Sequence, residues 1–211
     1  MKKYKFTGET KTICLPFGTV TLHRIKAVVE FGLVKVGDLG GWIEKEENLS
    51  HEENAWVYGD AEVCGNAKVY GDAEVYGNAK VYDNTWVYDN AWVYGDAKVY
   101  GNAEVCGNAK VCGNAEVYGD AWVCGNAKVF STDYVLVIGA IGSRNDFTTF
   151  FRDKDNEITV KCGCFLGKID KFLEKVTQTH KDTKHALVYR AAVEVAKLQI
   201  DLTEKVQGMK K

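Results

Sequence analysis

The chain has 211 residues and a formal net charge of −2, a length that allows one or two domains. The near-neutral charge excludes a general electrostatic attraction to nucleic acid or to anionic lipid. No apolar run reaches the length of a membrane span, and the basic residues 1–5 lack the apolar stretch of a signal peptide. We therefore expect a cytoplasmic protein whose seven cysteines are thiols rather than disulfides.

Residues 1–53 are interpreted as an N-terminal β cap. A strand-like run spans 20–29, and a glycine-rich turn follows it. Ile43, Leu49 and Ala55 lie six residues apart, in phase with the repeat that follows, which predicts degenerate first rungs. A cap is expected because the end of a solenoid exposes strand edges that would otherwise polymerise.

Residues 54–130 repeat a six-residue unit thirteen times without insertion. Valine returns at every sixth position from Val57 to Val129, and alanine stands two residues before each valine except at Thr85. Tyrosine, cysteine or phenylalanine follows each valine, and a Gly-Asn or Gly-Asp pair usually comes next. A period this strict indicates a stacked solenoid rather than a globular α/β domain.

The unit also predicts the geometry of each coil. Alternation along a strand places alanine and valine on one face and the remaining two residues on the other. The Gly-Asn or Gly-Asp pair supplies a tight turn, because these residue types tolerate positive φ. Three sides of six residues then close into a triangular coil, with small alanines beside larger valines in its interior.

With this pattern, residues 54–130 resemble the hexapeptide-repeat, left-handed parallel β-helix family. The resemblance implies a mainly β fold, with three hexapeptides in each coil of a left-handed parallel β-helix. The Tyr, Cys or Phe after each valine departs from that family, in which this residue is usually small or acidic. The stretches 37–44, 48–50, 142–151 and 160–165 also resemble segments of uncharacterised phage and prophage proteins, which implies a phage or prophage origin.

Stacking every eighteen residues places outward side chains in vertical ladders, with neighbouring rungs about 4.8 Å apart. Opposite charges then meet, with Glu62 over Lys80 and Lys98 over Glu116. The aromatic ladders either reinforce the coil or form an interface, and we favour self-association into a dimer or trimer because contiguous aromatic surface is rare on monomers. The candidate interface residues are Trp56, Tyr58, Tyr76, Trp92 and Tyr94 on the favoured side, with Trp86 and Trp122 on another side.

Four cysteines occupy the tyrosine position of the repeat, and we interpret them as small outward-facing side chains. Eighteen-residue stacking makes Cys106 and Cys124 vertical neighbours. The four residues are Cys64, Cys106, Cys112 and Cys124.

Residues 131–211 are predicted to form a small α+β domain. Strand signals lie at 134–138 and 147–152, and the run 157–165 completes a hairpin after a turn. Two helices follow, each with one apolar face. These faces consist of Ile169, Phe172, Leu173 and Val176 in one helix, and of Ala186, Tyr189, Val193, Ala196 and Ile200 in the other.

The loop 139–146 carries the chemistry that the repeats lack. Its polar, flexible residues and the nearby basic side chains are suited to an anion such as a phosphate or a nucleotide. The interpretation that we favour is a solvated loop in which Arg144 pairs with Asp146. The candidate ligand-binding residues are Ser143, Arg144, Asn145, Asp146, Arg152 and Lys161.

Cys162 and Cys164 are expected on the same side of a strand, with His180 and His185 on the helices. Two cysteines and two histidines are a zinc-binding set, but Cys-x-Cys is tighter than the usual ligand spacing. We therefore predict thiols that fill the hairpin face, with no bound metal and no cofactor.

The repeats do not favour catalysis. Hexapeptide-repeat acyltransferases and carbonic anhydrases normally use histidine, yet none occurs between Glu52 and Phe130, and the repeats carry no looped insertion. His51, just before the first repeat, is the residue that a subunit-interface site would use. Lys and Glu are mixed on every side, so a nucleic-acid partner is not expected. The chain is therefore predicted not to be an enzyme.

The leading hypothesis is a non-catalytic, homo-oligomeric binding protein of phage or prophage origin. The solenoid would be its scaffold and the C-terminal domain its recognition module, directed at a host defence or regulatory protein or at a nucleotide signal. One alternative is an enzyme, either acyltransferase-like at subunit interfaces or nucleotide-processing around Ser143, Arg144 and Asp146. Another alternative is a structural protein that forms filaments.

Overall fold

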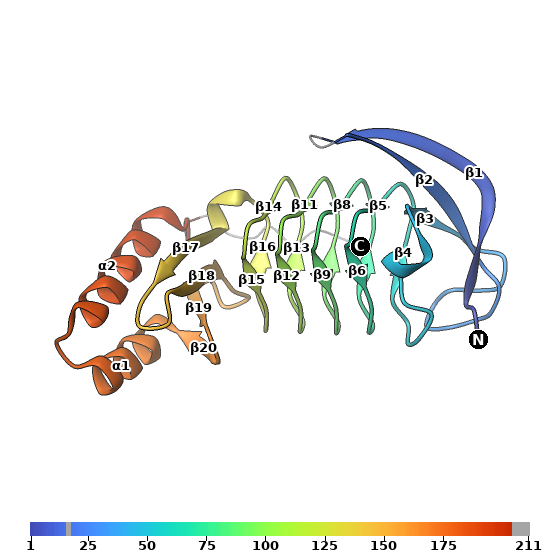
Figure 1. The fold of residues 1–211 in the computed structure, drawn as a ribbon. Helices are drawn as coiled ribbons and strands as arrows, with labels where there is room; N and C mark the ends of the chain where they lie inside the picture. Colours follow the sequence, from blue (N-terminus) through green and yellow to red (C-terminus); the bar gives the residue numbers. More distant parts are fainter. Residues whose placement is uncertain (16–17, 204–211) are drawn as a thin grey trace.

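The computed structural model describes residues 1–15 and 18–203, so the end of the predicted C-terminal domain lies outside the described residues. A regular solenoid occupies the middle of the molecule, a long hairpin lies at its N-terminal end and an α+β unit at its C-terminal end (Figure 1). The predicted fold class, a mainly β protein built on a three-sided parallel β-solenoid, is confirmed.

The N-terminal hairpin consists of β1 (Tyr4–Leu15) and β2 (Gly18–Ala27), which pair antiparallel. Only the second of these strands was predicted from the sequence. β3 (Leu39–Ile43) pairs antiparallel with β2 on one side and parallel with β5 (Glu62–Val63), a strand of the solenoid, on the other side. The cap and this side of the solenoid therefore belong to one hydrogen-bonded sheet. A 3-10 turn, η1 (Glu46–Asn48), follows.

Each repeat contributes a two-residue strand to one of three parallel sheets. Strands of one sheet are eighteen residues apart, as in the pairing of Trp92 with Lys110 and of Val93 with Val111. The strands are β4 (Trp56–Val57), β5 (Glu62–Val63), β6 (Lys68–Val69), β7 (Glu74–Val75), β8 (Lys80–Val81), β9 (Trp86–Val87), β10 (Trp92–Val93), β11 (Lys98–Val99), β12 (Glu104–Val105), β13 (Lys110–Val111), β14 (Glu116–Val117), β15 (Trp122–Val123) and β16 (Lys128–Val129).

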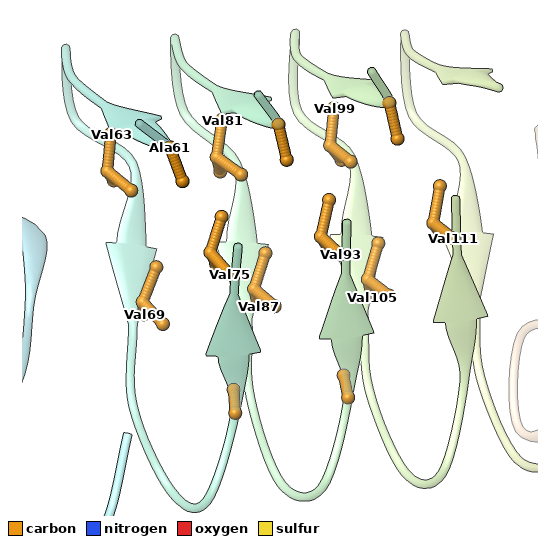
Figure 2. Packing of buried hydrophobic residues seen from close by; sticks show 14 of the residues in the cluster. Ala61, Val63, Val69, Val75, Val81, Val87, Val93, Val99, Val105 and Val111 are labelled. Carbon is orange, nitrogen blue, oxygen red and sulfur yellow. The ribbon is translucent and has the colours of Figure 1, made fainter. Parts of the chain in front are cut away.

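The valines and alanines of the repeat fill the interior, as predicted. Every one of these valines is at most 1% exposed, and they stack in columns along the coil axis (Figure 2). Thr85, the exception to the alanine pattern, is also buried, and its hydroxyl donates to the Tyr82 carbonyl at 2.8 Å. A hydroxyl therefore fits an alanine position because a turn carbonyl accepts its hydrogen bond.

The corners follow the predicted turn chemistry. The residue after each Tyr or Cys has a positive φ, and it is glycine except at Asp83 and Asp89, which have φ of 62° and 58°. These two carboxylates accept from the amides of Gly101 and Gly107, each at 3.1 Å, and this local bonding compensates the left-handed conformation. Asparagine side chains stack from coil to coil, as from Asn84 to Asn102 at 3.1 Å.

The first coil is longer than the repeat predicts. Ile43 pairs with Val63 and Leu49 bridges to Val69, so each lies twenty residues from its neighbour and takes a valine position rather than an alanine position. The degenerate rungs are therefore real, but the predicted phase with Ala55 is wrong. The two additional residues lie between Leu49 and Val57, where the chain passes beneath the cap.

The cap covers the first coil closely. Trp56 is fully buried and makes edge contacts with Tyr4 and Phe31, at 6.0 and 5.3 Å between ring centroids. The Lys3 ammonium, buried in the same region, donates to the Ala55 carbonyl at 2.7 Å and reaches two more carbonyls. Trp56 lies in the predicted ladder, paired with Glu74, but the prediction that it lies on an exposed wall is wrong, because aromatic rings of the cap cover it.

The four cysteines of the repeat are also more buried than predicted. Their exposed fractions are 1% for Cys64, 6% for Cys106, 0% for Cys112 and 6% for Cys124. Tyrosines at the same position are half-buried, except Tyr118, which is exposed, and they stack from coil to coil, as in Tyr76 on Tyr94 at 4.7 Å. A cysteine next to such a ring is shorter than the ring and is covered by it.

The C-terminal unit is a four-stranded antiparallel sheet with two helices. η2 (Thr132–Tyr134) leads into β17 (Val135–Ile141), β18 (Asp146–Arg152), β19 (Ile158–Cys162) and β20 (Phe165–Lys168), followed by α1 (Ile169–His180) and α2 (Lys184–Gln199). The run predicted as one strand, 157–165, is thus divided by a turn at Gly163.

This sheet is buried on both faces. Phe151 packs with the solenoid core, whereas the adjacent Phe150 packs with the helices on the opposite face. Side-chain hydroxyls also bond to the last coil, since the Trp122 amide donates to Thr149 Oγ1 at 3.0 Å and the Glu116 amide to Thr132 Oγ1 at 3.2 Å. Part of the strand edge that ends the solenoid is therefore covered by the chain itself.

Both helices bury the predicted faces. Ile169, Phe172 and Val176 of α1 lie in one cluster with Tyr189 and Val193 of α2. Within the described residues, neither helix combines the length and the apolar content that a bilayer-spanning segment needs.

Candidate functional site

A cavity of about 290 Å³ lies on the C-terminal unit, between the ends of the sheet and the two helices. Two turns and both helices supply its walls. Its lining is Ser143, Arg144 and Asp146 from the β17–β18 turn, Cys162, Gly163, Cys164 and Phe165 from the β19–β20 turn, Phe172, Lys175, Val176, Thr179 and His180 from α1, and Tyr189 from α2.

The β17–β18 turn is shaped by contact with α2. Gly142 has a φ of +73°, and a β-carbon at this position would lie 1.9 Å from the Tyr189 hydroxyl. Asn145 also adopts a positive φ, of 52°. Only glycine satisfies both the backbone conformation and the close approach at residue 142, so the turn packs directly against Tyr189.

The floor of the cavity is a short polar chain. The Thr148 hydroxyl donates to Cys162 Sγ at 3.3 Å, and the Cys162 thiol donates to the Tyr189 hydroxyl at 3.8 Å. Burial and the neighbouring Cys162 raise the pKa of Tyr189 to about 12, while Arg144 opposes this shift. Tyr189 is therefore a neutral hydroxyl at physiological pH, able to donate or accept a hydrogen bond.

Positive charge predominates at the cavity. Arg144 and Lys175 line it together with one carboxylate, Asp146. Among the described residues, Arg144 makes no ion pair with Asp146 and donates no hydrogen bond to the protein, so the expected pair is absent, although residues 143–146 are exposed as in a solvated loop. The guanidinium lies beside Gly163, where an added β-carbon would be 2.9 Å from Nη1.

Aromatic rings complete the walls. Phe172 makes an edge contact with Tyr189, with 5.4 Å between centroids, and Phe165 is tilted against Phe172 at the same distance. His180 is tilted against Tyr189 at 5.8 Å. A flat ring with an acidic group attached fits such a cavity chemically, because the rings offer stacking surface and the guanidinium offers paired N–H donors.

Three predicted ligand-binding residues do not line the cavity. Arg152 is 1% exposed at the far end of β18, where its guanidinium lies 4.5 Å from the Tyr134 ring and donates to the Asp201 carbonyl. Lys161 donates to the Gly163 carbonyl at 2.6 Å, and its ammonium lies 3.4 Å from the ring centroid of Trp122. The side chains of Arg152 and Lys161 therefore both make structural contacts within the protein. Asn145 belongs to the turn but does not line the cavity.

The four metal-ligand candidates do not converge. Cys162 and Cys164 flank the turn at Gly163 rather than sharing one face of a strand. His180 lines the cavity and His185 does not, although their rings are 5.9 Å apart. In the part of the chain that the structure describes, no three His, Cys, Asp or Glu side chains are grouped as metal ligands.

The candidate interface residues lie in different environments. Trp56 is buried, and Trp122 is half-buried against the C-terminal unit of its own chain. Trp86 is 43% exposed, with the Lys68 ammonium 6.0 Å from its ring. The remaining candidates, on the favoured side, are half-buried: Tyr58, Tyr76, Trp92 and Tyr94. Their role in an interface stays a prediction.

His51 lies in the cap, far along the chain from the cavity. Its ring stacks on Tyr4 with 4.3 Å between centroids, and its Nδ1 accepts from the Lys3 amide at 3.3 Å. Burial lowers the pKa of His51, against the opposing effect of Glu46. These contacts describe a histidine that is packed into the cap.

Sequence reasoning missed several residues of the cavity. Phe172 and Tyr189 were placed on the apolar helix faces, and their second role as cavity walls gives no sequence signal. Lys175 and Thr179 lie one turn apart on α1, on the side next to its buried face. Together with His180 they form a group of polar side chains at helical spacing, and this spacing is the sequence signal that would have identified them.

No protein-family model matches the chain. A stretch of 62 residues is 37% identical to a protein named as an uncharacterized acetyltransferase, YdcK of Escherichia coli (strain K12), and it covers 28% of this chain and 19% of that protein. The chain thus matches about a fifth of the length of this relative. This similarity, the six-residue period and the parallel coils agree with a hexapeptide-repeat β-helix.

Proposed function

We propose that this protein is a non-catalytic binding protein whose solenoid is a rigid scaffold and whose C-terminal unit recognises a small anionic ligand with a planar ring, such as a nucleotide. The observation that carries the proposal is the uncommitted Arg144 guanidinium at a cavity with aromatic walls. Lys175 adds a second positive charge, and among the described residues it too makes no ion pair.

The size and chemistry of the cavity define the ligand class. A volume of about 290 Å³ lies at the lower end of the volumes of small-molecule sites. This favours a mononucleotide over a dinucleotide. Arg144 is suited to two oxygens of one phosphate, and the Tyr189 hydroxyl to a polar edge of the base. The single carboxylate, Asp146, is the natural acceptor for a sugar hydroxyl or a base amine.

Calorimetric titration with nucleoside monophosphates and with inorganic phosphate tests the proposal. Arg144→Gln should lose at least tenfold in affinity, because the charged pair to phosphate is removed. Arg190→Gln is the matched control, since Arg190 lies on α2 outside the cavity and pairs with Asp182 at 3.8 Å. Equal affinity in both variants would contradict the assignment of Arg144. Absence of binding of every probe to the parent protein would refute a mononucleotide ligand and favour a protein partner.

Self-association is a further part of the proposal. The ladders of Tyr76 with Tyr94 and of Tyr70 with Tyr88 present stacked ring edges along the coil, and Trp86 is exposed beside the second ladder. A dimer or trimer through one such side would multiply the recognition units. Native mass spectrometry reports the subunit number and any retained ligand, and a monomer at micromolar concentration would refute this part.

The remaining elements of the proposal depend on the sequence resemblance. They are a phage or prophage origin, action in the host cytoplasm and a host defence or regulatory process as the target. A filament is not favoured, because the cap pairs with the first coil and the C-terminal unit covers part of the strand edge of the last coil.

An acyltransferase-like enzyme is the second candidate, favoured by the partial similarity to the protein named as an uncharacterized acetyltransferase. Its general base would be His51, the histidine next to the repeats. Release of free coenzyme A thiol from acetyl-coenzyme A distinguishes the candidates. Turnover that disappears in His51→Ala, with the oligomer intact, would support the enzyme and displace the binding proposal.

A further inference from the structure

The cysteine pair Cys106 and Cys124 is a feature that the proposed function does not use. Residues after the valine form three ladders along the coil, and one of them runs Tyr70, Tyr88, Cys106 and Cys124. The two tyrosine rings stack at 5.0 Å, and the two thiols continue the same ladder toward the C-terminal unit. In the other two ladders every cysteine has an aromatic neighbour instead of a second cysteine.

The strand register brings the two cysteines together. Val105 pairs with Val123 in parallel strands, and the Cys106 amide donates to the Val123 carbonyl at 3.0 Å. Neighbouring strands of a sheet are separated by about 4.8 Å. That spacing lies within the range of about 4.4–6.8 Å between α-carbons that a disulfide spans. Both cysteines are reduced in this structure.

The surroundings of the pair fix its geometry. The Trp122 indole N–H donates to Cys106 Sγ at 3.3 Å. The Trp122 ring is in turn held by the Lys161 ammonium at 3.4 Å and by the bond from its amide to Thr149. Each of the two cysteines is 6% exposed, so the pair lies just beneath the surface.

The same contacts make the two thiols unequal. Donation from the Cys124 thiol and from the Trp122 indole lowers the pKa of Cys106, although burial opposes this. The shared proton and burial raise the pKa of Cys124, and the Lys161 ammonium opposes that rise. Cys106 is therefore the thiol of the pair that loses its proton more readily, and thiolates are the species that react with oxidants.

We propose that Cys106 and Cys124 form a redox site, which hydrogen peroxide converts into a disulfide that joins the last coils of the solenoid beneath the C-terminal unit. The Cys106 thiolate attacks one peroxide oxygen, the O–O bond breaks, and Cys106 sulfenic acid and hydroxide result. The Cys124 thiol gives its proton to this hydroxide, which leaves as water. The Cys124 thiolate then attacks the sulfenic sulfur, the S–O bond breaks, and the departing hydroxide takes a proton from solvent. In total, two thiols and one peroxide give one disulfide and two waters.

A dithiol reductant reverses the reaction by thiol–disulfide exchange. Cys112, Cys162 and Cys164 are not arranged for the same chemistry. Cys162 and Cys164 are separated by the Gly163 turn, and Cys112 has Tyr94 and Phe130 as its ladder neighbours. The cross-link would close a loop of about eighteen residues and stabilise the native coil against unfolding.

The test uses the full chain in a Cys112→Ser background. Trypsin then leaves Cys106 in peptide 99–110 and Cys124 as the sole cysteine of peptide 111–128, so the cross-link is assigned without ambiguity. Folded protein is treated with peroxide, quenched with a maleimide and analysed by mass spectrometry. The expected result is a cross-linked 99–110/111–128 pair that dithiothreitol releases, together with a higher Tm in the oxidised sample.

Two variants in the same background complete the test. Cys106→Ser and Cys124→Ser should each lose the cross-link and the rise in Tm, and circular dichroism confirms that each is folded. In Cys124→Ser, peroxide should leave sulfenic acid on Cys106. The proposal is overturned if the folded parent shows only sulfinic or sulfonic acid on single cysteines. It is also overturned if the cross-link forms as fast in guanidinium-unfolded chain as in folded chain.

Discussion

Two turn glycines provide a direct test of how the coils fit together. Gly113 and Gly119 occupy the same repeat position, with φ of +62° and +66°. A β-carbon on Gly113 would lie 2.4 Å from the Phe130 carbonyl oxygen, whereas a β-carbon on Gly119 would meet nothing within 4 Å. The substitutions Gly113→Ala and Gly119→Ala therefore share the backbone change and differ only in the space above the turn.

The magnitude follows from three contributions. A left-handed conformation costs a residue with a β-carbon about 1–2 kcal/mol, and loss of glycine's freedom in the unfolded chain returns about 0.4–1 kcal/mol. Gly119→Ala should therefore lower the free energy of unfolding by about 1 kcal/mol. Gly113→Ala adds a clash with backbone, and overpacking of this kind costs about 1–3 kcal/mol more.

Urea unfolding followed by circular dichroism and by tryptophan fluorescence measures both values. Gly113→Ala should show a midpoint well below that of Gly119→Ala, with the slope of the transition unchanged. Equal midpoints would mean that the last coil is not seated on the turn at residue 113 as the structure has it. A lower midpoint for Gly119→Ala would refute the stacking argument altogether.

Three further perturbations have expected outcomes from burial and charge. Burial lowers the pKa of Lys3 to about 8, so the unfolded chain binds this proton more tightly. The free energy of unfolding of the parent, relative to that of Lys3→Met, should therefore rise from pH 8 to about 10 in urea titrations. Burial raises the pKa of Tyr58, Tyr76 and Tyr82 to about 12. The unfolded chain loses these protons first, so stability should fall above pH 10, and less steeply when all three are phenylalanine. Glu62, 8% exposed between two lysines at 2.8 and 3.0 Å, should lower the thermal midpoint on change to glutamine, because two ammonium groups then lack their carboxylate.

The regular part of the fold could be predicted from the sequence because every coil repeats the same local choices. A valine inside, a small residue beside it and a turn residue with positive φ determine the strand faces, and the eighteen-residue register follows. That register places Glu62 beside Lys80 at 3.0 Å and Lys98 beside Glu116 at 2.9 Å, as predicted.

The errors lie where the period breaks. Trp56 obeys the repeat in sequence but lies beneath the cap, and the glycine pair at 40 and 41 leaves room for its ring and for Val57. Nothing in the repeat itself records that another segment covers this position. The β1 strand was missed for a related reason, since its alternation is interrupted by polar residues that face solvent on both sides.

The candidate site was predicted in part, through the turn that carries Ser143, Arg144 and Asp146. The cavity wall formed by the two helices could not be predicted from the sequence. Lys175 and His180 come from α1, and Tyr189 comes from α2, more than forty residues after the turn. The helices reach the turn through a tertiary contact, the packing of Tyr189 against Gly142, and this contact has no signature in the local sequence.

The repeat determines where along the chain side chains are able to bind a ligand or to react. Within the solenoid, backbone groups of each coil bond to the next coil and the apolar side chains point inward, so little remains that is able to bind a ligand selectively. Specific groups are found where the last coil meets the C-terminal unit. Lys161 of β19 holds Trp122 and thereby the thiol pair, while the adjacent Cys162 forms the floor of the cavity. A single strand thus contacts both features, and the rigid coil behind them gives each a fixed position.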